Sequence, residues 1–247
     1  MFAVYKKELR SYFLNAIGYV YVGVFLAVSA ILSCLTTLTA ATYDTTDYFS
    51  YIIFSFIVLI PLLTMKTFAE EKKLRTEQLL LTAPVSLWGM VLGKFFAAMT
   101  LFVSSVLVSC INFFPLYAYA NAEGLNDAYA SAVGPVGVSI ICCTVGIILI
   151  GTAFIAIGMF ISSLTENQLA AAIITVAIIV AMLFLNMING SIENYAVRFV
   201  IDWVCFASRF APFASGMFDP SAILYYLSVS AIFLLLTVRV YDKRRWA

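Results

Sequence analysis

Histidine is absent from the 247 residues, and only 11% of them are charged. The absence of histidine excludes imidazole bases, histidine metal ligands and the histidine-dependent chemistry of intramembrane proteases and oxidases. Because ordinary soluble domains carry about 25% charged residues, a water-exposed fold is excluded as well. Four of the five cysteines lie within long apolar runs and none forms a CxxC pair, which favours small buried side chains over a disulfide or a metal site.

Apolar residues make up 64% of the chain and form six long charge-free runs, at 17–40, 48–65, 95–120, 133–161, 168–192 and 220–238. Each run is long enough to cross about 30 Å of hydrocarbon as a helix, and the lengths exclude barrel strands. The first run lacks a small-x-small cleavage site, so we interpret it as a retained span rather than a removed signal. We therefore expect an all-α polytopic membrane protein with six transmembrane helices, forming a single domain over residues 1–247.

Basic residues concentrate on one side of this predicted bundle. With six spans both chain ends share a side, and the opposite connections contain only Arg198 and Arg209 among the 14 Lys and Arg residues. The other twelve are Lys6, Lys7, Arg10, Lys66, Lys72, Lys73, Arg75, Lys94, Arg239, Lys243, Arg244 and Arg245. Because Lys and Arg are enriched in cytoplasmic loops, both termini are predicted to be cytoplasmic. The protein is then expected in the inner, cytoplasmic membrane.

The segment 1–14 has apolar residues at helical spacing and Lys6, Lys7 and Arg10 on the other side. This pattern predicts an amphipathic helix in the membrane interface, with its basic face toward anionic lipid headgroups. Two roles remain open at this point: a simple anchor before the first span, or a mechanical element.

The connection between the second and third runs holds the densest charge of the chain. Residues 69–82 predict a cytoplasmic helix, in which Glu71 and Arg75 can pair at i, i+4 and Pro84 marks the boundary. A solvated loop that follows the positive-inside rule is the alternative. That alternative does not require the interspersed acids or the leucine triplet at 79–81, whereas a docking helix for a soluble partner does.

Residues 193–218, between the fifth and sixth runs, are too apolar for a solvated loop. Polar residues at 194, 198, 202, 205 and 209 form one stripe, and aromatic residues fill the remaining faces. We expect short re-entrant helices that dip into the outer leaflet. They act either as a gate or as an aromatic belt that pins the last span.

The remaining motifs argue against independent chemistry. No charge falls within the six runs, which disfavours ion-coupled carriers, and no Walker-type phosphate loop is present. Gly89 and Gly93 form a GxxxG pattern, which favours close helix packing. We expect no enzymatic activity, no metal, no cofactor bound by this chain and no nucleic-acid partner.

The residues KKELRSYFLNAIGYVYVGVF at 6–25 and EEKKLRTEQLLLTAPVSLWGMVLGKF at 70–95 carry a resemblance that extends over essentially the whole chain. Together with the six runs and the outer insertion, they resemble the permease subunit of ABC-2-type ATP-binding-cassette transporters, and are most similar to its gliding-motility-type branch. The resemblance implies a dimer with a second copy or a paralogue, each docked on a separate cytosolic ATPase that binds ATP and Mg. It also implies export, and in this branch a large extracytoplasmic-domain membrane protein as a further partner.

Carried onto this sequence, the resemblance assigns roles to four groups of residues. The coupling helix would contain Glu70, Glu71, Lys72, Lys73, Arg75, Glu77, Leu79, Leu80 and Leu81, with Glu166 as a candidate second ATPase contact. Candidates to line a pathway in spans two and five are Ser50, Ser55, Thr64, Thr175, Asn186 and Asn189. An outer lid would contain Arg198, Asp202, Trp203, Phe206 and Arg209. Two other classes stay open: a structural anchor in a larger envelope or motility complex, and an ATP-independent secondary carrier.

Overall fold

The computed structural model describes residues 1–14, 16–40, 42–73, 86–126, 137–189, 205–206 and 208–245. Within these residues the chain is helical and contains no strand. The elements are α1 (Phe2–Leu14), α2 (Ala16–Ser33), the π-helical turn η1 (Cys34–Leu38), α3 (Thr46–Thr64), α4 (Ala69–Lys73), α6 (Leu87–Ser109), the 3₁₀ turn η2 (Cys110–Phe113), α7 (Phe114–Asn126), α8 (Gly137–Leu164), α9 (Gln168–Asn189), α11 (Ala211–Ala214) and α12 (Pro220–Arg245).

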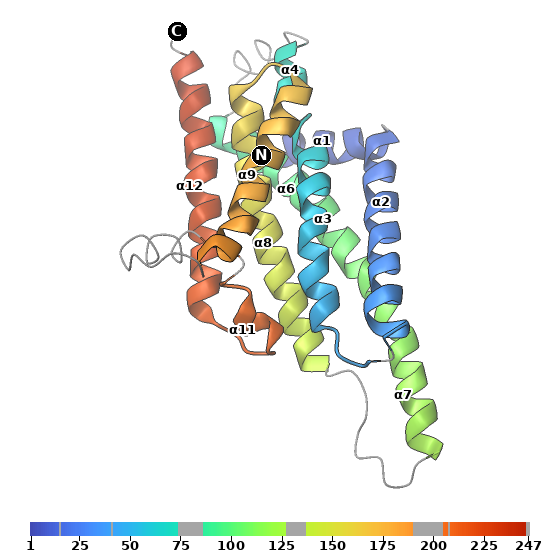
Figure 1. Cartoon of the computed structure of the whole chain (residues 1–247). Coiled ribbons are helices and arrows are strands. Elements are labelled where there is room, and N and C mark those ends of the chain that lie inside the picture. The colour runs from blue at the N-terminus through green and yellow to red at the C-terminus, as the bar shows by residue number, and fades with distance from the viewer. Residues whose placement is uncertain are drawn as a thin grey trace.

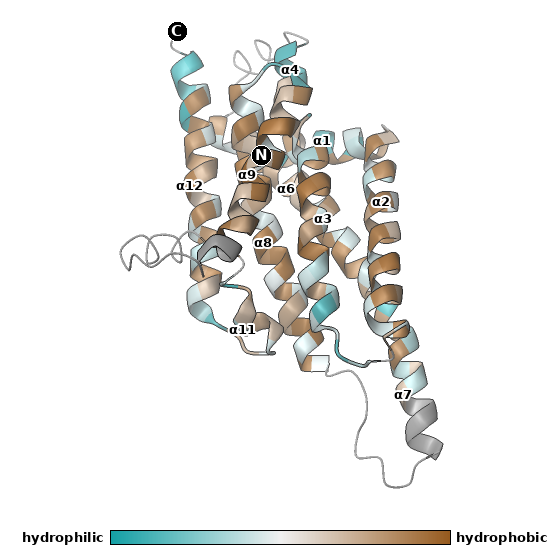
Figure 2. Ribbon diagram, in the orientation of Figure 1, coloured by the Kyte–Doolittle hydropathy of each residue, from teal (hydrophilic) through white to brown (hydrophobic). Residues whose placement is uncertain are grey.

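Six helical stretches of the described chain are long and apolar enough to cross a membrane, as the six apolar runs predict. They are Ala16–Leu38, Thr46–Lys73, Leu87–Ala120, Gly137–Leu164, Gln168–Leu185 and Pro220–Arg245. Figure 1 shows these helices running side by side, and Figure 2 shows hydrophobic residues along their length. A multi-pass membrane bundle follows from these lengths and compositions.

The third stretch differs from its predicted start. It begins at Leu87 rather than at residue 95, so Lys94 lies inside α6 instead of in the connection before it. The expectation that no charge lies within a span therefore does not hold at this position. The helix can extend because the ammonium group of Lys94 has partners on other helices, and Ser86 caps the helix by accepting a hydrogen bond from the Gly89 amide at 3.1 Å.

Helix α8 is the centre of the bundle, with 72% of its apolar window buried. Glycines allow its neighbours to approach closely. A Cβ atom on Gly151 would lie 2.2 Å from the Phe102 ring of α6, and one on Gly158 would lie 2.4 Å from Oγ1 of Thr64 in α3. These two positions therefore require glycine at the observed helix separation.

The two ends of the bundle carry different elements. Figure 1 shows α1 crossing one end at the level where α2 begins, with α4 and the C-terminal end of α12 extending beyond it. Helices α7 and α11 lie toward the opposite end. Hydrophilic residues gather at α4 and at the last turns of α12 (Figure 2). The helix α4, the helix α1 and the C-terminal end of α12 thus all lie toward one end of the protein.

The start of α3, toward the opposite end, is held by Asp44. Its carboxylate accepts a hydrogen bond from the Thr46 amide at 2.9 Å and another from the Thr46 hydroxyl at 2.6 Å. These two bonds, the side-chain bond first, lower the pKa of Asp44 below its ordinary value. A short polar side chain thereby satisfies a free amide at a helix start.

Candidate functional site

The buried side chain of Lys94 connects three helices at the end of the bundle where α1, α4 and α6 meet. Only 1% of this side chain is exposed. Its Nζ lies 2.8 Å from Oε1 of Glu71 in α4 and 3.3 Å from Oε1 of Glu8 in α1. It also donates a hydrogen bond to the carbonyl oxygen of Thr67 at 2.7 Å and lies 5.0 Å from the centre of the Phe68 ring. We call these groups the Lys94 cluster.

Two acids and one buried lysine would leave excess negative charge, and Lys7 offsets it. Its Nζ lies 3.7 Å from the carboxylate of Glu71 and 3.6 Å from that of Glu8. The side chain of Lys7 is 62% exposed, whereas those of Glu8 and Glu71 are 14% and 16% exposed. Removing one member of such a partly desolvated ion pair is costly, because it leaves a buried charge without a counterion.

Helix α1 reaches Lys94 because it packs directly on α6. A Cβ atom on Gly93 would lie 3.1 Å from the Val4 side chain and 3.2 Å from the carbonyl oxygen of Met1. Beyond this contact, the hydroxyl groups of Tyr5 and Thr100 share a hydrogen bond of 3.1 Å. The glycine pattern that predicts close packing therefore accommodates the N-terminal helix, and it brings Glu8 to a residue 86 positions away in the chain.

The C-terminal end of α8 binds the turn that leads into α4. The hydroxyl oxygen of Ser162 accepts hydrogen bonds from the amides of Phe68 at 3.2 Å and Ala69 at 3.1 Å, and this hydroxyl donates to the carbonyl oxygen of Met65 at 3.3 Å. One serine thus satisfies two free amides at the start of α4. The ammonium group of Lys72 donates to the main-chain oxygen of Ser163 and is 8% exposed.

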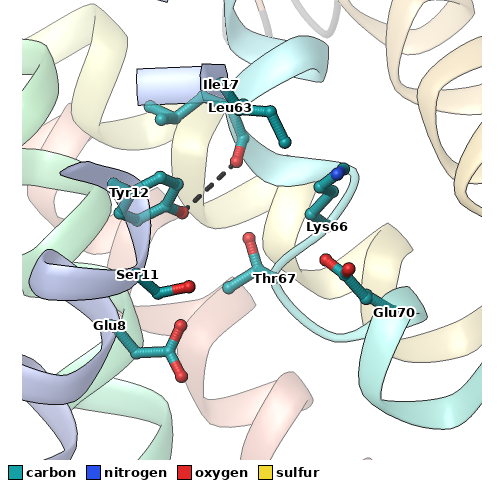
Figure 3. Close-up of a pocket in the computed structure, with 8 residues that line it drawn as sticks. All are labelled: Glu8, Ser11, Tyr12, Ile17, Leu63, Lys66, Thr67 and Glu70. Carbon is teal, nitrogen blue, oxygen red and sulfur yellow. Dashed lines mark hydrogen bonds between the residues drawn. The ribbon is translucent and has the colours of Figure 1, made fainter. Parts of the chain in front are cut away.

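A small pocket opens beside this cluster, between α1, the start of α2 and the end of α3. It is lined by Glu8, Ser11, Tyr12, Ile17, Leu63, Lys66, Thr67 and Glu70 (Figure 3). The Tyr12 hydroxyl donates to the carbonyl oxygen of Leu63 at 3.4 Å, and burial, followed by the nearby Glu8 carboxylate, raises the pKa of Tyr12. The phenol therefore stays protonated and acts as a donor between α1 and α3.

The pocket and the cluster carry charged groups of both signs. In the part of the chain that the structure describes, no three His, Cys, Asp or Glu side chains are close enough to hold a metal ion. The arrangement instead joins elements: α1, α3, α4, α6 and α8 are all tied at one end by hydrogen bonds or ion pairs.

The predicted coupling residues divide into two groups. Glu71 and Lys72 face inward, toward Lys94 and toward the end of α8, whereas Lys73 is exposed and Glu70 is partly exposed. Glu166 is exposed in the turn between α8 and α9. Arg75, Glu77, Leu79, Leu80 and Leu81 lie outside the described residues.

The predicted pathway residues lie in α3 and α9. Ser50 lines a mostly apolar pocket between α3, α9 and α11, together with Thr46, Ile53, Phe54, Leu183, Phe184, Phe210, Ala211, Ala214 and Ser215. Ser55 is partly buried and donates to the carbonyl oxygen of Ile52 at 2.6 Å. Thr64 and Thr175 are buried within the protein, at 0% and 1% exposure. Asn186 and Asn189 belong to α9, and their side chains lie outside the described part.

Of the predicted lid residues, Phe206 and Arg209 fall within the described chain, whereas Arg198, Asp202 and Trp203 do not. Phe206 is buried and stacks on Phe154 of α8 with ring centres 4.9 Å apart. Arg209 lies 5.4 Å from the centre of the Tyr225 ring and donates to the Ser221 hydroxyl at 3.2 Å. Phe206 therefore packs against α8, and Arg209 contacts α12.

Two neighbouring thiols of α8 add to these contacts. The Cys143 thiol donates to the carbonyl oxygen of Phe213 in α11 at 3.3 Å, and the Cys142 thiol donates to that of Gly216 at 3.4 Å. Gly216 has a φ of 77°, a left-handed conformation that favours glycine and allows the chain to turn toward α12. Cys142, Cys143 and Cys205 are buried, as the sequence predicts, whereas Cys34 is exposed because it lies on an outward face of its helix and the prediction is wrong there.

Sequence reasoning missed Lys94 and Glu8 as site residues. The apolar run that begins at residue 95 places Lys94 in the connection before the third span, where a lysine commonly marks a membrane boundary. The sequence feature that indicates burial of Lys94 is its position directly after Gly93. A residue beside a close contact between helices has little room to reach solvent.

A comparison with protein-family models matches residues 10–241 to the family described as ABC-2 family transporter protein. The chain belongs to the ABC-2 transporter family. As an ABC-2 protein it is a multi-pass membrane protein of the kind that forms the permease part of an ATP-binding-cassette transporter. Members of the family are generally not catalytic themselves and typically work with a cytosolic ATPase. A comparison with curated proteins gives no match.

The ABC-2 match includes Glu71, Lys94 and Ser162 but begins after Lys6, Lys7 and Glu8. The inner part of the Lys94 cluster therefore lies within the family region, whereas the first two turns of α1 precede it.

Proposed function

We propose that the chain is the permease subunit of an ATP-binding-cassette exporter, driven by a separate cytosolic ATPase that docks on the segment beginning with α4. A second copy or a paralogue would complete the transmembrane unit, and ATP and Mg would bind to the partner. The observation that carries this proposal is the Lys94 cluster, because it ties the charged helix α4, which ends at the exposed Lys73, to α1 and α6.

Force applied to α4 would reach the bundle by two routes. The first runs through Glu71 to Lys94, and thus to α6 and α1. The second runs through the Phe68 and Ala69 amides and the Lys72 ammonium group to Ser162 and Ser163 of α8. Because packed helices move as rigid elements, a tilt of α4 would move several spans together.

The orientation of this unit is supported by charge. Lys6, Lys7 and Arg10 of α1, Lys72 and Lys73 of α4, and the basic end of α12 gather at one end, whereas Asp44 and Asp219 flank helices that begin toward the other. With the positive-inside rule, the α4 end would be cytoplasmic, with both termini inside and the chain in the cytoplasmic membrane.

The docking face would consist of the outward residues of this segment. Glu71 and Lys72 are occupied within the protein, so Glu70 and Lys73, followed along the chain by Arg75 and Glu77, would meet the ATPase through charge pairs. Leu79, Leu80 and Leu81 would anchor the segment against the membrane. Glu166, exposed in the α8–α9 turn, would form a second contact.

Export would proceed along a surface between two permeases that includes α3 and α9. The apolar pocket lined by Ser50 supports this assignment, because it lies between these two spans and beside α11. The outer segment that contains Phe206 and Arg209 would close the exit.

The docking assignment is tested by reversing exposed charge while leaving the Lys94 cluster intact. The variant Lys73→Glu with Arg75→Glu should abolish permease-stimulated ATP hydrolysis or co-purification of the ATPase, without loss of membrane insertion. The matched control is Lys243→Glu with Arg245→Glu, at exposed basic positions near the end of α12. Normal ATPase stimulation in the first variant, or equal loss in the control, would reject docking at α4.

A further inference from the structure

The exposed side of α1 carries a basic depression that the Lys94 cluster does not use. It is lined by Ala3, Lys6, Lys7, Arg10, Ser11 and Leu14. Lys6 and Arg10 are exposed, and within the described residues no carboxylate forms an ion pair with either. Three cationic groups therefore lie on one surface of α1. Two of them, Lys6 and Arg10, can bind an anionic ligand from outside the described chain.

The position of α1 points to the membrane as the source of that ligand. Figure 1 shows α1 crossing the bundle where α2 begins, whereas α4 and the end of α12 extend farther from the spans. The apolar side chains of Phe2 and Leu14 are 77% and 73% exposed on the same short helix. A helix with exposed apolar and basic side chains at the end of a span lies at the depth of the headgroups.

We propose that this depression binds the phosphate of an anionic phospholipid headgroup, with Lys6 and Arg10 as its main donors and Lys7 as the third. The exposed apolar side chains of Ala3 and Leu14, which also line it, suit the glycerol and first acyl carbons of a lipid better than the acidic surface of a protein. Arginine supplies a planar pair of donors that matches a phosphate group.

The third donor connects this site to α4. Lys7 also lies 3.7 Å from Glu71 and 3.6 Å from Glu8, so a headgroup and these two carboxylates share one ammonium group. An anionic headgroup placed beside Lys7 fixes the side chain of a lysine that is otherwise 62% exposed.

The test uses the full chain in nanodiscs that contain phosphatidylcholine and a minority of phosphatidylglycerol. Lipids retained by the protein are counted by native mass spectrometry. Near a membrane surface each Lys or Arg is worth about 1 kcal/mol, or about fivefold in binding, so Lys6→Gln with Arg10→Gln should lower the retained phosphatidylglycerol to phosphatidylcholine ratio by roughly 25-fold at low salt. The preference of the wild type should fall as ionic strength rises.

The matched control is Lys243→Gln with Arg245→Gln, which removes two exposed basic residues from the same end of the bundle. Its lipid ratio should stay near that of the wild type. An unchanged ratio in the α1 variant, or an equal fall in the control, overturns the site. Retained lipid preference together with lost ATPase binding in the α1 variant also overturns it, because this face would then be a protein-docking surface. Equal unfolding temperatures of the two variants would show that both fold.

Discussion

The carboxylate of Glu71 lies 2.8 Å from the ammonium group of Lys94, inside the first turns of a span rather than at the protein surface. Glu71, which belongs to the charged segment between the second and third spans, is therefore bound to the helix bundle. The same carboxylate lies within ion-pair distance of Lys7, so α1 and α6 both hold α4 through one residue. This contact separates a structural group of charges in α4 from an outward group that is available to a partner.

Replacement of Lys94 by methionine should destabilise the protein strongly. The change leaves Glu71 and Glu8 without their buried counterion, which typically costs about 3–5 kcal/mol. Thermal unfolding in detergent measures the effect. Lys73→Met is the matched control, because Lys73 is an exposed lysine at the same end. A Lys94→Met variant that unfolds at the same temperature as this control would contradict the internal role of the cluster.

The Ser162→Ala substitution should loosen the contact between α4 and α8. It removes the acceptor of the Phe68 and Ala69 amides, and buried donors left without partners cost about 1–3 kcal/mol. Amide hydrogen exchange at residues 68 and 69 should rise. Ser163→Ala serves as the control, since Ser163 binds Lys72 through its main-chain oxygen and its hydroxyl donates only within α8. Equal exchange in both variants would remove Ser162 from the transmission route.

The Gly151→Ala substitution should overpack the centre of the bundle. The new methyl group would lie 2.2 Å from the fully buried Phe102 ring, and such insertions cost about 1–3 kcal/mol. Adding Phe102→Leu should recover part of the loss, as measured by thermal unfolding of the single and double variants. In contrast, Gly23→Ala meets nothing within 4 Å and should be neutral or slightly stabilising. Failure of Phe102→Leu to rescue would place the strain elsewhere.

The start of α3 should lose protection in acid. Hydrogen bonds from Thr46 lower the pKa of Asp44 in the folded protein, so its stabilising effect is present above the unfolded pKa of about 3.9 and is lost as pH falls through the lower folded value. Exchange of the Thr46 amide, corrected for its intrinsic rate, should rise over that interval. Asp44→Asn keeps an acceptor that does not titrate and should abolish this pH dependence. A pH dependence that survives in Asp44→Asn would assign it to another group.

The six spans could be predicted because a run of about 20 apolar residues has few alternatives in a membrane protein. The inward orientation of Glu71 could not. Helix spacing proposes only Arg75 as its partner, a residue outside the described part of the chain, and gives no sign that its carboxylate also reaches Lys94 and Lys7 on two other helices. Local spacing measures only neighbours on one helix, whereas the packing of α1 on Gly93 determines which distant charges meet. The same limit applies to Gly151 and Gly158, whose partners lie on separate spans.

Helix α8 forms hydrogen bonds near both of its ends, with elements that lie at opposite ends of the bundle. Near one end the Ser162 hydroxyl binds the turn before α4, and near the other the Cys143 thiol binds α11. Its 28 residues form an uninterrupted ladder of backbone hydrogen bonds about 42 Å long, which resists stretching and compression. A displacement of α8 along its own axis would therefore move α11 and the turn before α4 together. The two ends of the bundle would then be mechanically coupled through a single helix.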